Sequence, residues 1–220
     1  VNLINLHGLG YHGQGVIIGI LDTGFRRDHA AFNYPGHALN VVAEHDFVNN
    51  DGDTGIQGGD HGEQHVHGSL ILSVIGAYRP DELVGGAYDA SFILAKTENV
   101  ASETPVEEDY YVAGLEFIES NGGDMATASL GYIDWYTQGD LDGQTAVTTI
   151  AVNIANNNGL HCCTAAGNEG NGVIERRSVQ LAVEEANAAG GVIPGRRVEL
   201  VAIDYGETYA TVVAAAADEV

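Results

Sequence analysis

Basic residues are scarce in this chain of 220 residues. Eight lysines and arginines stand against 31 aspartates and glutamates, and the net charge is -23 with histidine neutral. Non-specific binding of nucleic acid needs a basic footprint, so the composition argues against a nucleic-acid partner. A strongly acidic, self-repelling surface is typical of proteins from salt-rich habitats and also of acidic secreted proteins, and both interpretations stay open.

Long apolar runs and separated cysteines are lacking too. No stretch approaches the roughly 20 apolar residues of a membrane-spanning helix, which predicts no membrane partner, and no signal peptide is visible. The only cysteines, Cys162 and Cys163, are neighbours. Successive side chains on a strand point to opposite faces, so we predict that the two do not pair and are buried packing residues.

Short apolar runs alternate with helix-length segments, and 45% of the residues are hydrophobic, which fits a folded core. The apolar runs predict strands at 16–21, 41–48, 91–97, 124–130 and 159–166. The segments between them predict helices at 68–77, 105–120 and 140–158. Strands that alternate with helices indicate an α/β fold with a parallel sheet flanked by helices and right-handed crossovers.

The character of the chain changes after residue 170, and we divide it into segments 1–170 and 171–220. The second segment predicts a helix at 176–189, a strand at 197–203 and an Ala-rich helix at 208–220. The amphipathic first helix and the apolar strand must bury their apolar sides, so we expect this helix-strand-helix segment to dock on the same sheet.

The first predicted strand ends on a carboxylate, in Asp22-Thr23-Gly24. Open parallel sheets place their sites at the carboxyl ends of the strands, so Asp22 is a candidate catalytic residue. A simpler interpretation is an aspartate that caps a turn. Asp-Thr-Gly is also a signature of aspartic proteases, but those are mostly β and need a second such aspartate.

A histidine begins the first predicted helix, in His67-Gly68-Ser69. A helix would fix the aim of the imidazole, as a general base requires, and Gly68 would let the chain turn tightly. His61-Gly62 is a competing pair, although the residues after it break the pattern. The cluster of His61, His65 and His67 could also indicate a metal site, but His65 and His67 would diverge on a strand.

Asn168 follows the last predicted strand of the first segment, in a turn of small residues. A side-chain amide at such a place can donate to an oxyanion, and losing one such donor costs about 3 kcal/mol of transition-state stabilisation. The other interpretation is an asparagine that serves the geometry of the turn.

Taken in order, the stretches 13–24, 67–75 and 164–170 resemble the subtilisin-like serine proteases (subtilases, peptidase S8), over about residues 1–170. The resemblance implies that Asp22 and His67 belong to the catalytic triad and Asn168 to the oxyanion hole. The segment Ser129, Leu130 and Gly131 resembles the family's substrate-binding segment. The function that this resemblance implies is that of a serine endopeptidase, which acts by acyl transfer on an extended peptide or protein outside the cell.

The same resemblance implies a subtilisin-like sheet whose C-terminal third is missing or replaced. Calcium is common in the family, and the loop 50–55 looks superficially like a calcium loop. It lacks the later bidentate glutamate, so we assign no metal site and no cofactor.

The family's nucleophile segment, of the Gly-Thr-Ser-Met-Ala type, does not occur in these residues. The single serine after Asn168 is Ser178, whose neighbours do not resemble that segment. We therefore expect little or no peptidase activity from the chain as given. A truncated or recombined gene, an artificial hybrid, and a divergent protease with another nucleophile would each account for the ending.

Residues 176–220 carry a resemblance of their own. The run 181–201 looks like the first helix and second strand of type I periplasmic ligand-binding proteins. The alternative function is therefore a non-catalytic pseudoprotease, or a hybrid fragment that binds a small molecule or a peptide.

Overall fold

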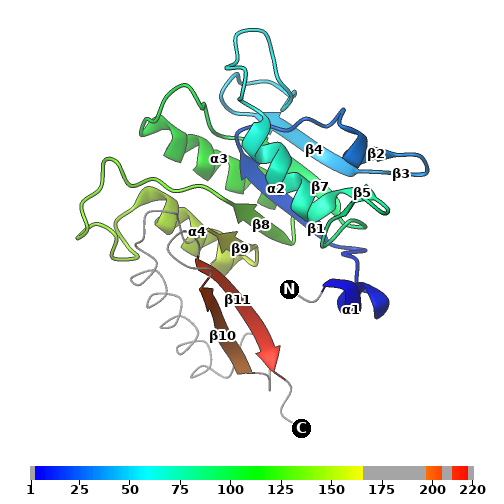
Figure 1. Ribbon diagram of the computed structural model, residues 1–220. Coiled ribbons are helices and arrows are strands. Elements are labelled where there is room, and N and C mark those ends of the chain that lie inside the picture. Colours follow the sequence, from blue (N-terminus) through cyan, green and yellow to red (C-terminus); the bar gives the residue numbers. More distant parts are fainter. Residues whose placement is uncertain (1–2, 166–196, 205–209, 218–220) are drawn as a thin grey trace. The chain divides into compact units, whose positions relative to one another are not determined.

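The computed structural model describes residues 3–165, 197–204 and 210–217 (Figure 1). Up to Thr164 the chain is one compact unit with a five-stranded sheet in the order β4-β7-β1-β8-β9. These strands are β1 (Ile17–Asp22), β4 (Asn40–Asp46), β7 (Ser91–Lys96), β8 (Met125–Ala128) and β9 (His161–Thr164). All four pairings are parallel, so the carboxyl ends of the strands meet at one edge. The parallel sheet and its flanking helices confirm the predicted α/β fold.

Three longer helices cover the sheet, and short elements complete the unit. The helices are α2 (Val66–Gly76), α3 (Val106–Ser120) and α4 (Val147–Asn158). The short elements are α1 (Leu3–Gly8), a 3-10 turn η1 (Ala30–Phe32), and the two-stranded ribbons β2 (Asn33–Tyr34) with β3 (His37–Ala38) and β5 (Tyr78–Arg79) with β6 (Leu83–Val84). None of the helices in the described residues is long and apolar enough to cross a membrane.

The helices divide between the two faces of the sheet. On one face, Leu21 and Ile93 are buried in a cluster with residues of α3 and α4. On the other face, Ile18 and Ile20 are buried in a cluster with Leu72 of α2. Because successive side chains of a strand point to opposite faces, Asp22 continues the series of Ile18 and Ile20. The alternation of β1 therefore directs the terminal carboxylate toward the face that α2 covers.

The last helix of this unit begins later than its sequence pattern predicts. The helix α4 begins at Val147, whereas the prediction began at residue 140. Asp142 accepts hydrogen bonds from the backbone N–H groups of Gln144 and Thr145, both at 2.8 Å, and Gly143 has a φ of 80°. A short acidic side chain that binds the backbone just ahead of it favours a turn over a helix.

The prediction of buried cysteines is wrong for one of the pair. Cys163 is exposed and Cys162 is partly buried, and both thiols are free. Both lie on β9, which is the last strand in the order of the sheet and pairs with β8 on one side. An apolar run in the sequence does not reveal that, among the described residues, its strand has a paired neighbour on one side only.

The second compact unit is formed by residues 165–220. Its described part is an antiparallel hairpin of β10 (Arg197–Asp204) and β11 (Ala210–Ala217). A strand is predicted at 197–203, and β10 lies there. The predicted helix at 208–220 is wrong, because 210–217 pairs with β10 along its whole length, from Asp204 opposite Ala210 to Arg197 opposite Ala217. Cross-strand pairing overrides the helix propensity of alanine here. The predicted helix at 176–189 lies outside the described residues.

Candidate active site

The carboxylate that ends β1 is fully buried. Asp22 has no solvent exposure, and its Oδ1 accepts a hydrogen bond of 2.7 Å from the backbone N–H of Thr23. The other carboxylate oxygen, Oδ2, has no hydrogen-bond partner within the described residues. Burying a carboxylate costs free energy unless a group of opposite charge or a strong hydrogen-bond donor lies beside it, so Asp22 needs such a partner.

The imidazole of His67 supplies that partner. Its Nδ1 lies 2.7 Å from Oδ1 of Asp22, and its side chain remains 45% exposed. At this distance Asp22 and His67 lie side by side at the carboxyl edge of the sheet. The competing His61 instead turns to its own loop, where its Nδ1 accepts from the backbone N–H of Glu63 at 3.3 Å.

Gly68 allows α2 to lie close to the end of β1. We expected this glycine to serve a tight turn instead. The residue lies in the first turn of α2, and its N–H donates to Oγ1 of Thr23 at 3.1 Å. A Cβ atom at this position would lie 2.2 Å from the backbone oxygen of Gly24 and 3.2 Å from Cβ of Asp22. Only glycine lets the helix and the turn after β1 meet at this distance.

The electrostatics of the pair suit a base. The hydrogen bond to Asp22 raises the pKa of His67 above its ordinary value, against the effect of partial burial and with a smaller Coulombic contribution from the same carboxylate. If Nδ1 donates its hydrogen to Asp22, Nε2 is left with a free lone pair. The exposed side of the ring can then take a proton from a neighbouring hydroxyl.

A cavity of about 530 Å³ opens beside the imidazole. His67 and Thr23 line it together with the predicted substrate-binding residues Ser129, Leu130 and Gly131. Its opposite wall is residues 98–103, which follow β7 along the chain. The three candidate binding residues and the candidate base therefore share one pocket.

The wall after β7 includes a buried acid that the sequence patterns did not single out. Glu98 is 8% exposed, and its carboxyl accepts from the hydroxyl of Tyr132 and from Oγ1 of Thr97. Burial raises the pKa of Glu98 to about 8, with a smaller contribution from the nearby charge of Glu107. The sequence signal was available, because the polar run directly after a buried strand must lie at the same sheet edge as Asp22.

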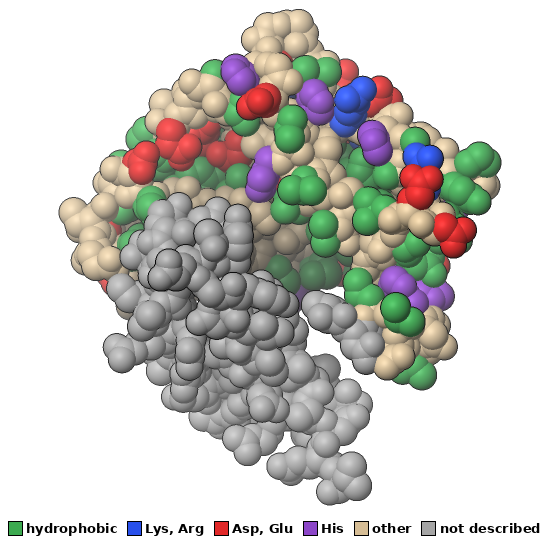
Figure 2. Space-filling view, viewed as in Figure 1, with side chains coloured by type: hydrophobic (Ala, Val, Ile, Leu, Met, Phe, Trp, Pro, Cys, Tyr) green, Lys and Arg blue, Asp and Glu red, His purple; other side chains and the backbone are tan. Residues whose placement is uncertain are grey.

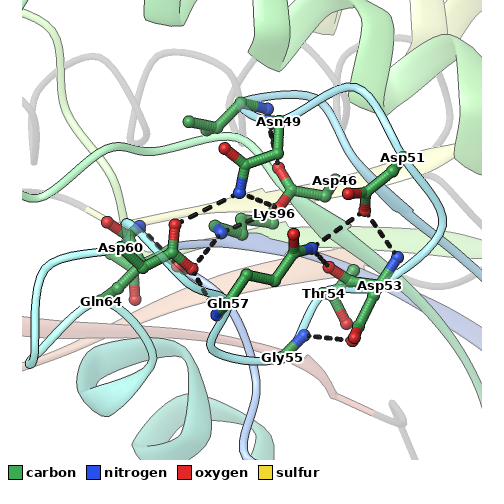
Figure 3. A network of polar contacts seen from close by, with 12 residues as sticks. Asp46, Asn49, Asp51, Asp53, Thr54, Gly55, Gln57, Asp60, Gln64 and Lys96 are labelled. Carbon is green, nitrogen blue, oxygen red and sulfur yellow. Dashed lines mark hydrogen bonds and ion pairs between the residues drawn. The ribbon is translucent and has the colours of Figure 1, made fainter.

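The acidic loop between β4 and α2 is held by the ammonium group of Lys96 (Figure 3). This lysine is fully buried, and its Nζ lies 2.8 Å from Oδ2 of Asp46 and 2.8 Å from Oδ2 of Asp60. Asn49 bridges the same two acids, at 3.0 Å and 3.2 Å. The loop is thus organised around an internal cation.

The candidate metal ligands of the sequence are not brought together in the described ranges. These ranges contain no group of three or more His, Cys, Asp or Glu side chains placed to hold a metal ion. In the calcium-like loop, Asp51 and Asp53 accept instead from the backbone N–H groups of Asp53 and Gly55, both at 2.9 Å. Two further candidates, Asn168 and Ser178, lie outside the described residues.

The described surface carries the acidic character of the sequence. Acidic side chains are spread over the described part of the face in Figure 2, with histidines between them. Two of the eight basic residues, Arg27 and Arg79, pair with Glu44 and Glu82 at 2.9 Å and 2.8 Å. These bases are therefore already matched by acids.

Comparison with curated proteins gives relatives of one kind. The chain is 29% identical to subtilisin E of Bacillus subtilis over 167 residues, which cover 75% of this chain and 37% of that protein. It is 29% identical over 159 residues to the minor extracellular protease Vpr of the same species, with 69% and 19% covered. For the subtilisin of Bacillus pumilus, the identity is also 29%, with 75% and 52% covered. The chain thus spans about half or less of the length of these relatives.

Solved structures agree on the fold. The prenylagaramide maturation protease PagA matches with a TM-score of 0.57 at 15% identity, over 77% of this chain and 52% of that one. The CspB protease of Clostridium perfringens matches with a TM-score of 0.55 at 20% identity, over 74% and 38%. The sequence profile described as the subtilase family, peptidase S8, matches residues 13–217, which include most of the segment after residue 170. The chain belongs to the subtilase family of peptidases.

Proposed function

We propose that this chain carries the orienting acid, the general base and the substrate groove of a serine endopeptidase that cleaves extended peptides outside the cell. The contact of 2.7 Å between Nδ1 of His67 and Oδ1 of Asp22, beside an open cavity, is the observation that supports it. Membership of a peptidase family and the name of Vpr as an extracellular protease support the reaction class and the location.

The proposed chemistry is acyl transfer. A serine hydroxyl attacks the carbonyl carbon of the scissile bond, and its proton moves to Nε2 of His67. Asp22 holds the imidazole in the required tautomer and stabilises the imidazolium. The same proton then passes to the leaving amine, and water repeats the sequence to release the acid. Asn168 is proposed to donate to the oxyanion.

The groove provides for an extended substrate. Ser129, Leu130 and Gly131 follow β8, residues 98–103 follow β7, and these two strands flank β1 in the sheet. An extended peptide can pair its backbone with such a segment by strand addition. The proposed partner is therefore a peptide or protein in extended conformation.

The proposed activity of these 220 residues by themselves is low. They contain no serine in a segment like that of the family nucleophile, and Ser178 has unlike neighbours. Without an activated nucleophile, His67 and Asp22 cannot form an acyl-enzyme. The second candidate function is peptide binding without cleavage, as in a pseudoprotease, for which the open cavity lined by residues 129–131 would serve. Residues 176–220 resemble a type I periplasmic ligand-binding protein. The other non-catalytic candidate is therefore a hybrid fragment that binds a small molecule or a peptide.

Three proteins decide between these functions: wild type, His67→Ala and Ser178→Ala. Each is incubated with a fluorophosphonate probe and with an unstructured peptide substrate, and subtilisin E serves as the positive control. We expect no label and no turnover, but binding of the peptide that shifts the NMR signals of residues 129–131.

Each other outcome has a definite meaning. Turnover lost in both variants would identify Ser178 as the nucleophile, and turnover lost only in His67→Ala would place the nucleophile elsewhere. Absence of peptide binding would remove the groove from the proposal.

A further inference from the structure

Gln64 is a buried amide that neither motif includes. It is 1% exposed and lies in the loop just before α2. Its Nε2 donates to the backbone oxygen of Thr23 at 2.7 Å and also to the backbone oxygen of Glu98. Its Oε1 accepts from the backbone N–H of Val100 at 3.2 Å.

These bonds use the amide group fully at both ends. The two donors of the NH₂ group and the carbonyl acceptor all have backbone partners, and Thr23 and Glu98 are themselves buried. Glutamine is one of the few side chains with donors and an acceptor on one planar group. Removing it would leave the backbone oxygens of the buried residues Thr23 and Glu98, and the N–H of Val100, without this partner, and an unsatisfied buried polar group destabilises the fold.

The three partners belong to the two parts of the proposed site that must keep a fixed relation. Thr23 follows Asp22 at the end of β1, and its Oγ1 accepts from the N–H of Gly68, next to His67. Glu98 and Val100 belong to the wall of the cavity that follows β7. One side chain thus joins the Asp22 turn to the groove wall.

We infer that Gln64 is a positioning residue that holds the turn of Asp22 and the substrate-binding wall 98–100 in register. The inference rests on the proposed function, because it assigns this wall to peptide binding. Gln64 touches neither the ring of His67 nor the carboxylate of Asp22 through any described hydrogen bond, so it acts through the backbone.

A second glutamine offers a matched control. The Nε2 of Gln57 also donates twice, to the backbone oxygen of Asp53 at 2.7 Å and to Oδ1 of Asp51 at 3.0 Å. Those partners lie in the acidic loop and do not line the cavity beside His67. Replacing either glutamine by methionine removes an amide and keeps the length of the side chain.

The test compares Gln64→Met with Gln57→Met in the full 220-residue chain. Two quantities are measured by NMR: the pKa of His67, and the dissociation constant of an unreactive extended peptide. We expect Gln64→Met to bring the pKa of His67 toward its ordinary value and to weaken the peptide about tenfold, which is 1.4 kcal/mol. Gln57→Met is expected to leave both unchanged. A lower melting temperature with both quantities unchanged would make Gln64 merely structural and would overturn the inference.

Two further measurements keep the inference testable if Gln64→Met does not fold. Gln64→Asn keeps a neutral amide on a side chain one methylene shorter, which cannot reach all three partners, and we expect the same two changes in smaller degree. In wild type, the amide hydrogen of Val100 is expected to exchange slowly, and an unprotected rate would contradict the inference. If wild type binds no peptide, the proposed function fails, while the pKa of His67 and the exchange of Val100 still decide the role of Gln64.

Discussion

The ammonium group of Lys96 lies 2.8 Å from the carboxylate of Asp60, and thereby joins the end of β7 to the loop that leads to His67. Burial by itself would lower the pKa of Lys96, but its hydrogen bonds to Asp46 and Asp60 outweigh that effect and raise it. The side chain is therefore a permanent cation inside the protein. Its single positive charge is shared by two acids, Asp46 and Asp60, in a chain whose net charge is -23.

Lys96→Met is expected to destabilise the fold strongly. The variant keeps the apolar stem but leaves Asp46 and Asp60 close together without a counter-charge. Breaking a buried pair by removing one partner costs about 3–5 kcal/mol. Urea unfolding at pH 7 measures the loss.

The matched control is Arg79→Met, which removes a cation from an exposed pair with Glu82. Exposed pairs contribute about 0.2–1 kcal/mol. Equal losses of unfolding free energy in the two variants would show that the buried ion pairs of Lys96 stabilise the fold no more than an exposed pair does.

The network around Lys96 marks the limit of what sequence patterns predict. The alternation of apolar strands with helices predicted β1, β4, β7 and the place of Asp22, because these are local patterns. The pairing of Asp22 with His67 followed from the family motif together with the geometry of a parallel sheet. The partners of Lys96, by contrast, come from segments far apart in the chain, and no local pattern encodes which acids will surround a buried cation.

The same reason explains the errors and omissions. The alanines of 210–217 predict a helix until a partner strand is present, and Gln64 looks like an ordinary loop residue. The alanine segment is a strand because it pairs with β10, the neighbouring strand of its hairpin, whereas the partners of Gln64 lie 34 to 41 residues away in the sequence. Elements defined by tertiary pairing are the ones that the sequence pattern did not reveal.

The hydrogen bond between Nδ1 of His67 and the carboxylate of Asp22 is expected to be visible in the titration of His67. In wild type, the pKa of His67 should lie above its ordinary value of about 6.5 and should fall in Asp22→Asn, because the neutral amide no longer favours the imidazolium. Since the folded-state pKa is raised, the stabilisation is fully present below pH about 6.5 and is lost as the pH rises through the folded pKa. An NMR titration of the histidine ring protons measures the shift.

Asp28→Asn is the control for this titration, because Asp28 is exposed and pairs with Arg26 away from the imidazole. It should leave the pKa of His67 in place. A wild-type value at or below 6.5 would show that the contact with Asp22 does not persist in solution.

Glu98 is expected to make the fold less stable as the pH rises. Its pKa is about 8 in the folded chain because of burial, whereas the ordinary value is 4.5. The folded state therefore binds more protons between these two values, and stability should fall with rising pH across this window. In Glu98→Gln, the decrease of stability with rising pH should be smaller than in wild type. At pH 9 the free energy of unfolding of the variant should exceed that of wild type by at least about 1.4 kcal/mol, which corresponds to one pKa unit.

Unfolding curves from pH 4 to pH 9 test this prediction, with Glu82→Gln as the control at an exposed acid. The amide introduced by Glu98→Gln would still offer an oxygen to Tyr132 and Thr97. If Glu98→Gln retains the full wild-type slope between pH 5 and pH 8, ionisation of Glu98 is not its cause.

Gly68→Ala tests whether the closeness of α2 to β1 creates the catalytic pair. Alanine favours a helix by about 1 kcal/mol over glycine, so propensity alone would make the variant more stable. The new Cβ atom would however lie 2.2 Å from the backbone oxygen of Gly24, and backbone cannot move aside cheaply. We expect the free energy of unfolding to fall by about 1–3 kcal/mol. The pKa of His67 should fall as well, because the helix must withdraw from Asp22.

Gly62→Ala is the control, since a Cβ there has no neighbour within 4 Å. It should change stability by no more than about 0.5 kcal/mol. A stabilised Gly68→Ala with an unchanged His67 titration would show that the approach of α2 tolerates a side chain, and that another contact sets the geometry of the pair.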